Sequence, residues 1–497
     1  MSLNWRSANW RSALGATSLT ALLATAVSPI FGPAHADTAI IVGGGYKLSA
    51  SQGQIELNVK WAQDVLKRSG LQVHTFFTDG DDPAVDVHVA ADDNSQPRDN
   101  EALTRVFSDM RYAWTRYHSN TVPDLSGGTD ANDLLPAITG ILSDSSPDDL
   151  PPLLVYNGHG GPSNKDADDV TLKLWNETRV TAEQLHTLLE KDNTDLRFVL
   201  TQCYSGGFHR IAYQDSQQGL GLSEAQRCGF TAESSWRISE GCSASINTED
   251  YRDYTTFFFA ALDGTTRNGE PLSSPVTDYD ADGVTSLRDA HLHTIENAHS
   301  TDLSRSTSED YLTTWQPWLE RWLPVNNDVP DNEYGDVYRA LLQRHQINDD
   351  TSAARTIRSK LKQHEADRLA LVRELNTLGR QAHTLATTLR RNTIAQWPAL
   401  GAPYEDSYLQ LVSSGDMVEI NQWLSDTEGY AELRDIQLQI APLTDNLLNA
   451  ERDAVQMRKL LRLRKLARLK ARLYETGDQQ HITDYERLVS CESHPLK

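Results

Sequence analysis

A histidine and a cysteine each follow an apolar run in this 497-residue chain, and both lie beside glycines. His159 comes after residues 153–156 and is followed by Gly160, whereas Cys203 comes after residues 196–200. An imidazole can take the proton of a thiol, and the resulting thiolate is a strong nucleophile. The backbone N–H groups of Gly160 and Cys203 could stabilise the oxyanion that forms during acyl transfer. The sequence therefore predicts nucleophilic catalysis by Cys203, with His159 as the base.

The elements that must position these residues are buried strands. Apolar runs typical of such strands alternate with helical stretches, which indicates an α/β fold with a mainly parallel sheet flanked by helices. The carboxyl ends of neighbouring parallel strands face one crevice, so His159 and Cys203 meet there if their strands are adjacent. The structural alternative is a buried thiol at Cys203 and an ordinary loop histidine at His159. The expected strands are residues 38–42, 71–77, 152–156, 196–200 and 230–232.

The two blocks together resemble the caspase, legumain and gingipain group of cysteine peptidases, and look most like its legumain-type bacterial relatives. In that group one apolar strand ends in His-Gly and the next ends in the nucleophilic cysteine, as happens here 44 positions apart. The resemblance covers residues 38–322 and implies a caspase-like fold, with His159 as base, Cys203 as nucleophile and Gly160 as oxyanion support. The chain departs from legumain in the Thr201-Gln202 pair before the cysteine, and no asparagine follows the first strand to assist His159.

These features predict a cysteine endopeptidase that hydrolyses peptide bonds through an acyl-enzyme on Cys203. A transpeptidase would use the same intermediate, and a catalytically inactive calcium-binding scaffold or adhesion protein of the same fold is the alternative from another class. The acidity of the catalytic half favours cleavage after basic residues, with Glu233 as the candidate substrate-binding residue. The legumain resemblance instead implies cleavage after asparagine.

A second motif has the spacing of an EF-hand calcium loop, in which oxygen ligands recur at alternate positions. Three aspartates at positions one, three and five precede a glycine at position six, where such loops bend sharply. The alternative is an acidic turn before a helix that Ser286 caps. The sequence predicts a structural Ca²⁺ and no organic cofactor. The predicted ligands are Asp278, Asp280, Asp282, the carbonyl of Val284, Ser286 and Asp289.

Residues 1–36 have the features of a cleavable signal peptide: two arginines, an apolar run, and the small-x-small sequence Ala34-His35-Ala36. We therefore expect a secreted or periplasmic protein. No later stretch is apolar enough to span a bilayer. In an oxidising compartment the four cysteines are candidates for disulfides, although their number does not define the pairing. The short span between Cys228 and Cys242 favours a bond there, which would spare Cys203.

The tail at residues 351–497 is predicted to be a separate helical domain. Apolar residues recur at steps of four and three over 357–389 and again over 440–461, which indicates two long antiparallel helices with a compact helical insertion between them. Prolines, asparagines and a glycine loosen residues 324–350, and we interpret residues 326–350 as a linker after a catalytic domain at 37–325.

Charge is distributed unevenly between these two parts. Residues 37–350 contain 23 basic and 50 acidic residues, whereas residues 351–497 contain 21 and 19. The acid excess argues against general nucleic-acid binding, which needs a basic surface. Eight basic residues between Arg458 and Arg472 offer a contact for an anionic membrane or a protein partner, but the leucines among them favour a helix packed on its neighbour. The expected partners are a peptide or protein substrate and, through the C-terminal helices, a further protein.

Overall fold

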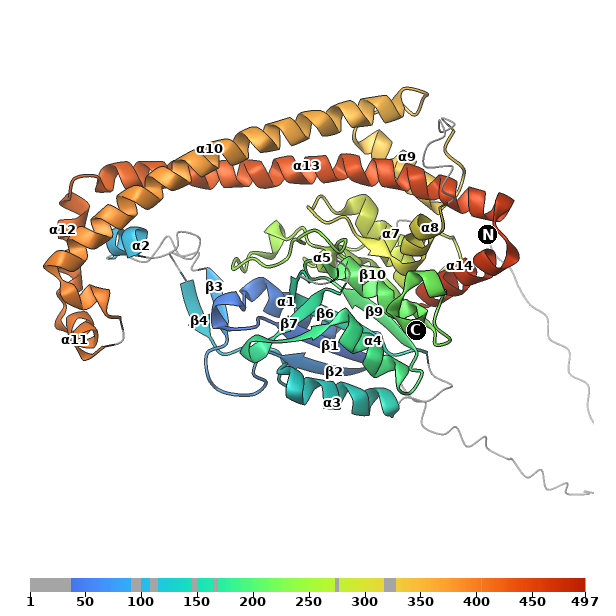
Figure 1. The fold of residues 1–497 in the computed structure, drawn as a ribbon, viewed down its shortest axis with the longest axis horizontal. Helices are drawn as coiled ribbons and strands as arrows, with labels where there is room; N and C mark the ends of the chain where they lie inside the picture. Colours follow the sequence, from blue (N-terminus) through green and yellow to red (C-terminus); the bar gives the residue numbers. More distant parts are fainter. Residues whose placement is uncertain are drawn as a thin grey trace, which may run out of the picture. The chain divides into compact units, whose positions relative to one another are not determined.

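The computed structural model describes residues 37–90, 100–107, 115–144, 150–163, 166, 169–272, 277–316, 328–403 and 405–496. A mainly parallel sheet with helices on its two faces is followed by a helical region (Figure 1). This arrangement confirms the predicted class, α/β followed by all-α. The signal peptide predicted for residues 1–36 lies outside the described residues.

The nine-stranded sheet has the central order β11-β10-β9-β6-β1-β2-β5. Neighbouring strands along this order are parallel, apart from the antiparallel pair of β10 and β11. The hairpin of β7 and β8 adds to the end of β6, and a separate two-stranded sheet pairs β3 with β4. The strands are β1 Thr38–Gly44, β2 Gln72–Phe77, β3 Val87–Ala90, β4 Thr115–His118, β5 Leu125–Gly127, β6 Leu153–Gly161, β7 Thr171–Leu174, β8 Thr178–Thr181, β9 Leu196–Leu200, β10 Arg227–Thr231 and β11 Arg305–Ser306.

Both faces of the central strands are buried, and alternate residues serve different faces because the side-chain period of a strand is two. Ile41 and Val155 pack in one core with helices α1, α5 and α7. Ile40 and Leu154 pack in another core with α3, α4 and the short 3₁₀ helix η4. The helices that cover the sheet are α1 Gly53–Arg68, α3 Ala131–Ser143, α4 Ala182–Glu190, η4 Ser205–Ala212, α5 Tyr254–Asp263 and α7 Leu287–Asn297.

Two long helices dominate the helical region and pack along each other, as the seams predict (Figure 1). Ion pairs join them, including Arg368 with Glu451 and Arg458 with Glu365. The remaining helices are α2 Glu101–Phe107, α8 Thr307–Trp315, α9 Glu333–Arg344, α10 Ala353–Gln396, α11 Asp406–Ser414, α12 Met417–Asp426, α13 Tyr430–Thr476 and α14 Gln479–Glu492.

The basic run of α13 packs as a helix, as its leucines predict. Leu460, Leu463 and Leu466 are fully or almost fully buried in a core that they share with α8, α9, α14 and the first turns of α10. Arg462 from the same run pairs with the buried carboxylate of Glu309. The α13 helix therefore joins the sheet-containing part through both apolar and ionic contacts.

The segment predicted as a linker, residues 326–350, contains a packed helix over much of its described part. Helix α9 begins after Asn332, whose side chain caps it by accepting from the Gly335 N–H. Tyr334, Val337 and Leu341 are fully buried in the core shared with α13. The linker prediction was wrong there, because the loop-forming residues of this segment cap a helix whose apolar spacing makes it part of the core.

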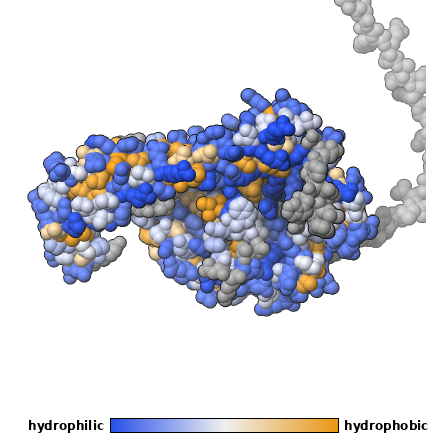
Figure 2. Space-filling model, turned by 45° about the horizontal axis from the view of Figure 1, so that its top comes forward, coloured by the Kyte–Doolittle hydropathy of each residue, from blue (hydrophilic) through white to orange (hydrophobic). Residues whose placement is uncertain are grey.

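The described surface is mostly hydrophilic, with separate apolar patches (Figure 2). Several exposed apolar side chains belong to the helical region, among them Leu369, Val418 and Leu448. Within the described residues, no helix combines the length and hydropathy that crossing a bilayer would require.

Candidate active site

The ends of strands β6 and β9 bring the two predicted catalytic residues to the same level. These strands pair in parallel, with Tyr156 opposite Leu200. Three residues after that pair, His159 is still within β6, where it pairs with Lys173 of β7, whereas Cys203 lies beyond the end of β9. Both residues are therefore at the carboxyl edge of the parallel strands. Gly160 lies directly against Cys203, because a Cβ atom added to it would collide with the carbonyl oxygen of Cys203. Only glycine fits at this position without displacing the backbone of the cysteine.

The imidazole of His159 is oriented by the segment that follows β1. Its Nε2 atom lies 2.8 Å from the carbonyl oxygen of Ala50 and 2.9 Å from Oε1 of Gln52. A carbonyl oxygen can only accept, so Nε2 carries the ring proton and Nδ1 is left as the basic nitrogen. The ring of Tyr46 packs edge-on against the imidazole, with 5.6 Å between the ring centres. This segment therefore orients His159, with the side-chain amide of Gln52 in place of an asparagine directly after the first strand.

Cys203 lies in a tight turn between β9 and η4. The next residue, Tyr204, has a φ of 63°, in the left-handed region that non-glycine residues seldom occupy. Its N–H donates to the carbonyl oxygen of Arg237 over 2.8 Å, and η4 begins at Ser205. The thiol itself accepts from the N–H of Ser239, with 3.3 Å between nitrogen and Sγ. The turn and the Ser239 contact together fix the direction of the thiol.

Both groups are neutral near neutral pH for the same physical reason. Burial raises the pKa of the Cys203 thiol, and the carboxylates of Asp302 and Glu233 raise it further, while the Ser239 hydrogen bonds lower it. Burial also lowers the pKa of His159, with a smaller contribution from Lys173. Within the described part of the chain, no hydrogen bond joins His159 to Cys203. Such bonds are often long or poorly aligned before substrate binds.

Glu233 does not occupy the position that a substrate-binding residue requires, and that prediction was wrong. The residue is fully buried, and its carboxylate accepts from Arg237 Nε and from the N–H groups of Ser234 and Leu303. An ion-paired carboxylate in the interior is unavailable to a substrate side chain. The expected preference for basic residues therefore has only the overall acidity of residues 37–350 behind it.

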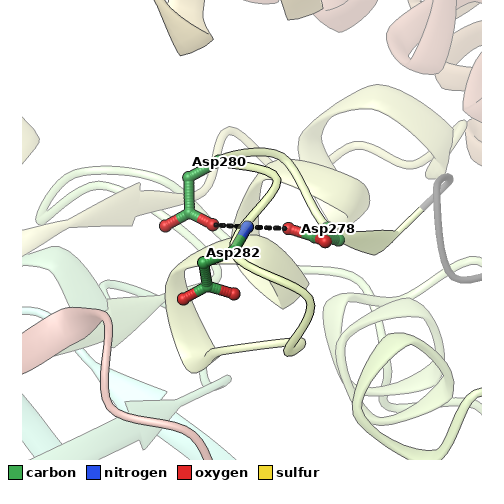
Figure 3. Close-up of side chains that lie close together, drawn as sticks. All are labelled: Asp278, Asp280 and Asp282. Carbon is green, nitrogen blue, oxygen red and sulfur yellow. Dashed lines mark hydrogen bonds between the residues drawn. The ribbon is translucent and has the colours of Figure 1, made fainter.

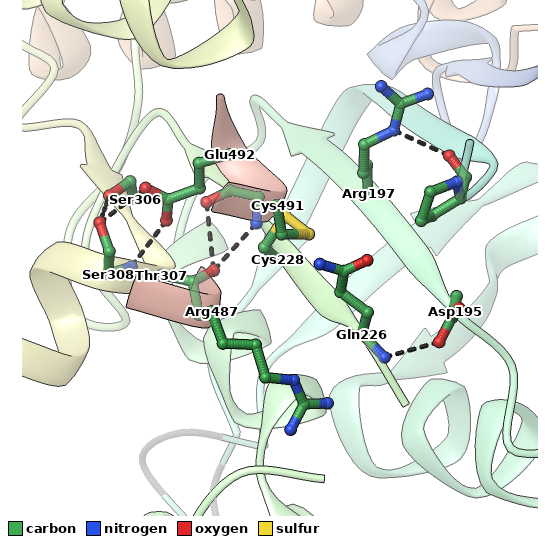
Figure 4. The surroundings of a disulfide bond; sticks show 12 residues. Asp195, Arg197, Gln226, Cys228, Ser306, Thr307, Ser308, Arg487, Cys491 and Glu492 are labelled. Carbon is green, nitrogen blue, oxygen red and sulfur yellow. Dashed lines mark hydrogen bonds between the residues drawn. A yellow bond between two sulfur atoms is a disulfide. The ribbon is translucent and has the colours of Figure 1, made fainter. Parts of the chain in front are cut away.

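The predicted disulfide between Cys228 and Cys242 was also wrong. Cys228 on β10 is bonded to Cys491 on α14, 263 positions away (Figure 4). Cys203 and Cys242 are free. Cys228 lies in the core that β10 shares with α14, whereas Cys242 belongs to the loop beyond Ser239. Cys203 has a free thiol, as expected, although the disulfide that Cys228 forms is with Cys491 and not with Cys242.

Two cavities flank the loop that contacts the thiol. One, of about 460 Å³, is lined by Gly206 and Gly207 after the nucleophile and by the 234–236 segment after β10. The other, of about 1150 Å³, lies between residues 236–243 and helix α13. Cys203 and His159 are not among the residues that line either cavity.

The functional contacts that the sequence did not reveal come from Ala50, Gln52, Ser239 and Tyr204. A backbone carbonyl and a backbone N–H have no residue-type signature, so the contacts of Ala50 and Ser239 were not readable from the chain. The left-handed conformation of Tyr204 gives no signal either, because glycine is absent there. Gln52 contacts His159 through its side chain, but it lies 107 positions before the histidine and therefore outside any local motif around the His-Gly block.

The loop predicted to bind calcium brings three of its six residues together. Carboxylate oxygens of Asp278, Asp280 and Asp282 all lie within 4.8 Å of one another, and the Asp282 N–H donates to the carboxylates of both Asp278 and Asp280 (Figure 3). Burial, followed by the charge of Asp289, raises the pKa of Asp280. A hard divalent cation would relieve that repulsion. The donor set therefore fits Ca²⁺.

Asp289 and Ser286 have a second role in this loop. Each side chain accepts from the backbone N–H of the other, which forms the capping box of α7. The other Asp289 carboxylate oxygen accepts from the Tyr279 N–H over 2.9 Å. The side chain of Val284 is exposed, as expected for a residue that would offer only its carbonyl. The helix cap proposed as the alternative is thus present together with the cluster of aspartates.

Comparisons with protein-family models and with curated proteins find no match to this chain.

Proposed function

We propose that this protein is a cysteine endopeptidase, with Cys203 as nucleophile and His159 as base. The observation that carries the proposal is the shared level of the two residues at the ends of β6 and β9, with Nδ1 of His159 left basic by the Ala50 carbonyl. A neutral thiol needs only proton transfer to an oriented base to become a nucleophile.

The chemistry follows from this arrangement. As Sγ of Cys203 bonds to the scissile carbonyl carbon, the thiol proton moves to Nδ1 of His159. The backbone N–H groups of Gly160 and Cys203 are the proposed donors to the oxyanion. The imidazolium then gives its proton to the leaving amine, and the C–N bond breaks to leave a thioester. Water, deprotonated by the same imidazole, hydrolyses the thioester and restores the thiol.

The alternative is an inactive scaffold of the same fold, and the absence of a His159–Cys203 hydrogen bond among the described residues favours it. A mixture of fluorogenic peptides with different residues before the scissile bond separates the two functions. Turnover that depends on both residues supports the peptidase, whereas a protein that cleaves none of them under reducing conditions, with and without calcium, supports the scaffold. Transfer of the acyl group to an added amine instead of water would identify a transpeptidase.

The state of the thiol predicts how its reactivity depends on pH. Because the pKa of Cys203 lies above its ordinary value, the thiolate fraction should still grow beyond pH about 8.5. Because the pKa of His159 is lowered, the base stays unprotonated at neutrality, and hydrolysis should fall only below pH about 6.5. We expect alkylation of Cys203 by iodoacetamide to accelerate through that upper range. A plateau below neutral pH would indicate a preformed ion pair and contradict the prediction.

We also propose that the Asp278–Asp289 loop binds a structural Ca²⁺. An ion that binds only the folded state stabilises it by about 2.7 kcal/mol at a hundredfold excess over its dissociation constant. Calcium should therefore raise the melting temperature, and Asp280→Asn should remove most of that response. Asp263→Asn, which changes an aspartate outside the loop, is the control that should respond like the unaltered protein. Identical melting curves with chelator and with millimolar calcium would exclude the site.

Export is part of the same proposal. The signal-peptide features of residues 1–36 support it, and the disulfide between Cys228 and Cys491 is of the kind that persists in oxidising compartments.

A further inference from the structure

The loop of residues 236–243, here named the thiol loop, touches the nucleophile on two sides. The Ser239 N–H donates to Sγ of Cys203, and the Arg237 carbonyl accepts from the N–H of Tyr204, the residue after the nucleophile. The Ser239 hydroxyl donates to the Thr201 carbonyl over 2.9 Å, just before the nucleophile. The position of the thiol loop therefore determines which donors reach Sγ.

Helix α13 holds this loop through two ion pairs. Arg237 Nη2 lies 3.1 Å from the Glu451 carboxylate, and the guanidinium of Arg452 contacts both carboxylate oxygens of Glu240. The side chains of Arg452 and Glu240 are each 15% exposed, and Arg237 is 12% exposed. Ion pairs at this depth are screened less by solvent than surface pairs are. Glu451 and Arg452 are consecutive residues, so one turn of α13 engages both ends of the Arg237–Glu240 segment.

The charges around the thiol oppose its ionisation. Glu233 after β10 and Asp302 before β11 are the nearby acids that raise its pKa, and the free Cys242 lies in the thiol loop itself. On the β6 side, burial raises the pKa of Tyr156 and the charges of Cys242 and Cys203 raise it further, while burial lowers the pKa of His159 on the same strand. The Ser239 hydrogen bonds are the contacts that favour the thiolate. If the thiol loop moved away, the thiolate of Cys203 would lose the Ser239 N–H donor and remain near Glu233 and Asp302.

We propose that α13 positions the Ser239 N–H on Cys203, through Glu451 and Arg452, and so sets the reactivity of the nucleophile from the helical region. Glu451 and Arg452 are thus positioning residues, because they act through the thiol loop and touch no reacting atom. The inference rests on the proposed role of Cys203 as nucleophile, but its test measures the thiol itself and needs no hydrolysis.

The test is the rate of Cys203 alkylation by iodoacetamide as a function of pH in Arg452→Gln and Glu451→Gln. Loss of a hydrogen bond to the thiolate should slow alkylation at neutral pH by about threefold to tenfold and move the midpoint of the curve upward. Arg452→Lys, which keeps the charge, should recover part of the rate. Tryptic peptides Phe198–Arg210 and Ile238–Arg252 separate Cys203 from Cys242, so each thiol is quantified alone by mass spectrometry.

Lys470→Gln is the matched control, because it removes an ion pair between α13 and Glu333 of α9 that does not involve the thiol loop. It should leave the Cys203 curve unchanged. Unchanged curves in both Arg452→Gln and Glu451→Gln would overturn the proposal, as would an equal shift in Lys470→Gln. If alkylation slows in these variants but the unaltered protein cleaves no peptide, the coupling between α13 and the thiol holds and the peptidase proposal fails. The failure of one proposal can therefore be distinguished from the failure of the other. Melting curves identify a variant that has not folded, and the near-isosteric Glu451→Gln then decides the outcome.

Discussion

Replacing Cys203 by alanine should lower peptide hydrolysis by at least about three orders of magnitude, as removal of a covalent nucleophile does in other enzymes. The turn at Tyr204 and the strand pairing remain in the variant, so the melting temperature should change little. His159→Ala should be nearly as inactive, because the thiol would then have no base to take its proton. A double variant should be no worse than either single one, since the two residues act in the same step.

The matched control for this experiment is Cys242→Ala, which removes the other free thiol. It should keep its hydrolytic activity and lose only the second alkylation site. Initial rates on the best fluorogenic peptide, with melting curves for each variant, make the measurement. Full activity in Cys203→Ala would refute the proposed mechanism. Loss of activity in Cys242→Ala alone would show that Cys242, and not Cys203, is the nucleophile.

Removal of the disulfide between Cys228 and Cys491 should have the largest effect on stability. The bond closes a loop across 263 positions, for which the chain-entropy account gives a contribution of about 5 kcal/mol to the free energy of unfolding. It connects the sheet strand β10 to the last helix, and both sulfur-bearing residues are fully buried. We therefore expect the double variant Cys228→Ala, Cys491→Ala to unfold at a much lower denaturant concentration than the unaltered protein.

Denaturant unfolding of the oxidised protein, the reduced protein and the double variant measures this effect. The reduced protein should resemble the double variant, and a reductant should leave the double variant unchanged. Equal midpoints for all three would show that the packing of α14 stabilises the structure without the bond. Helix α14 should stay at least partly packed when the bond is removed, because Glu492 next to the disulfide also pairs with the buried Arg288.

Local patterns in the sequence determined the class of the fold and placed the two candidate site residues at the ends of neighbouring strands. Apolar runs long enough for buried strands, followed directly by His159-Gly160 and by Cys203, depend on neighbours within a few positions. Burial on both faces of a parallel sheet requires such runs, and parallel strands end at one edge. The two long helices follow from the same kind of local evidence, since a seam at steps of four and three lies on one side of a helix. The aspartates at 278, 280 and 282 also came together, because their spacing alone folds them around one turn.

Tertiary structure decided every contact between distant parts of the chain. The partner of Cys228 lies 263 positions away, the carbonyl that orients His159 lies 109 positions before it, and the N–H that reaches Cys203 lies 36 positions after it. Packing against Arg237 and two backbone N–H groups buried Glu233, which the sequence placed at the substrate. Residues 333–344 joined the core because their apolar face met α13, whereas the loop-forming residues around them suggested a linker. Such contacts depend on which distant surfaces pack together in the folded protein. Short stretches of sequence do not show which surfaces these are.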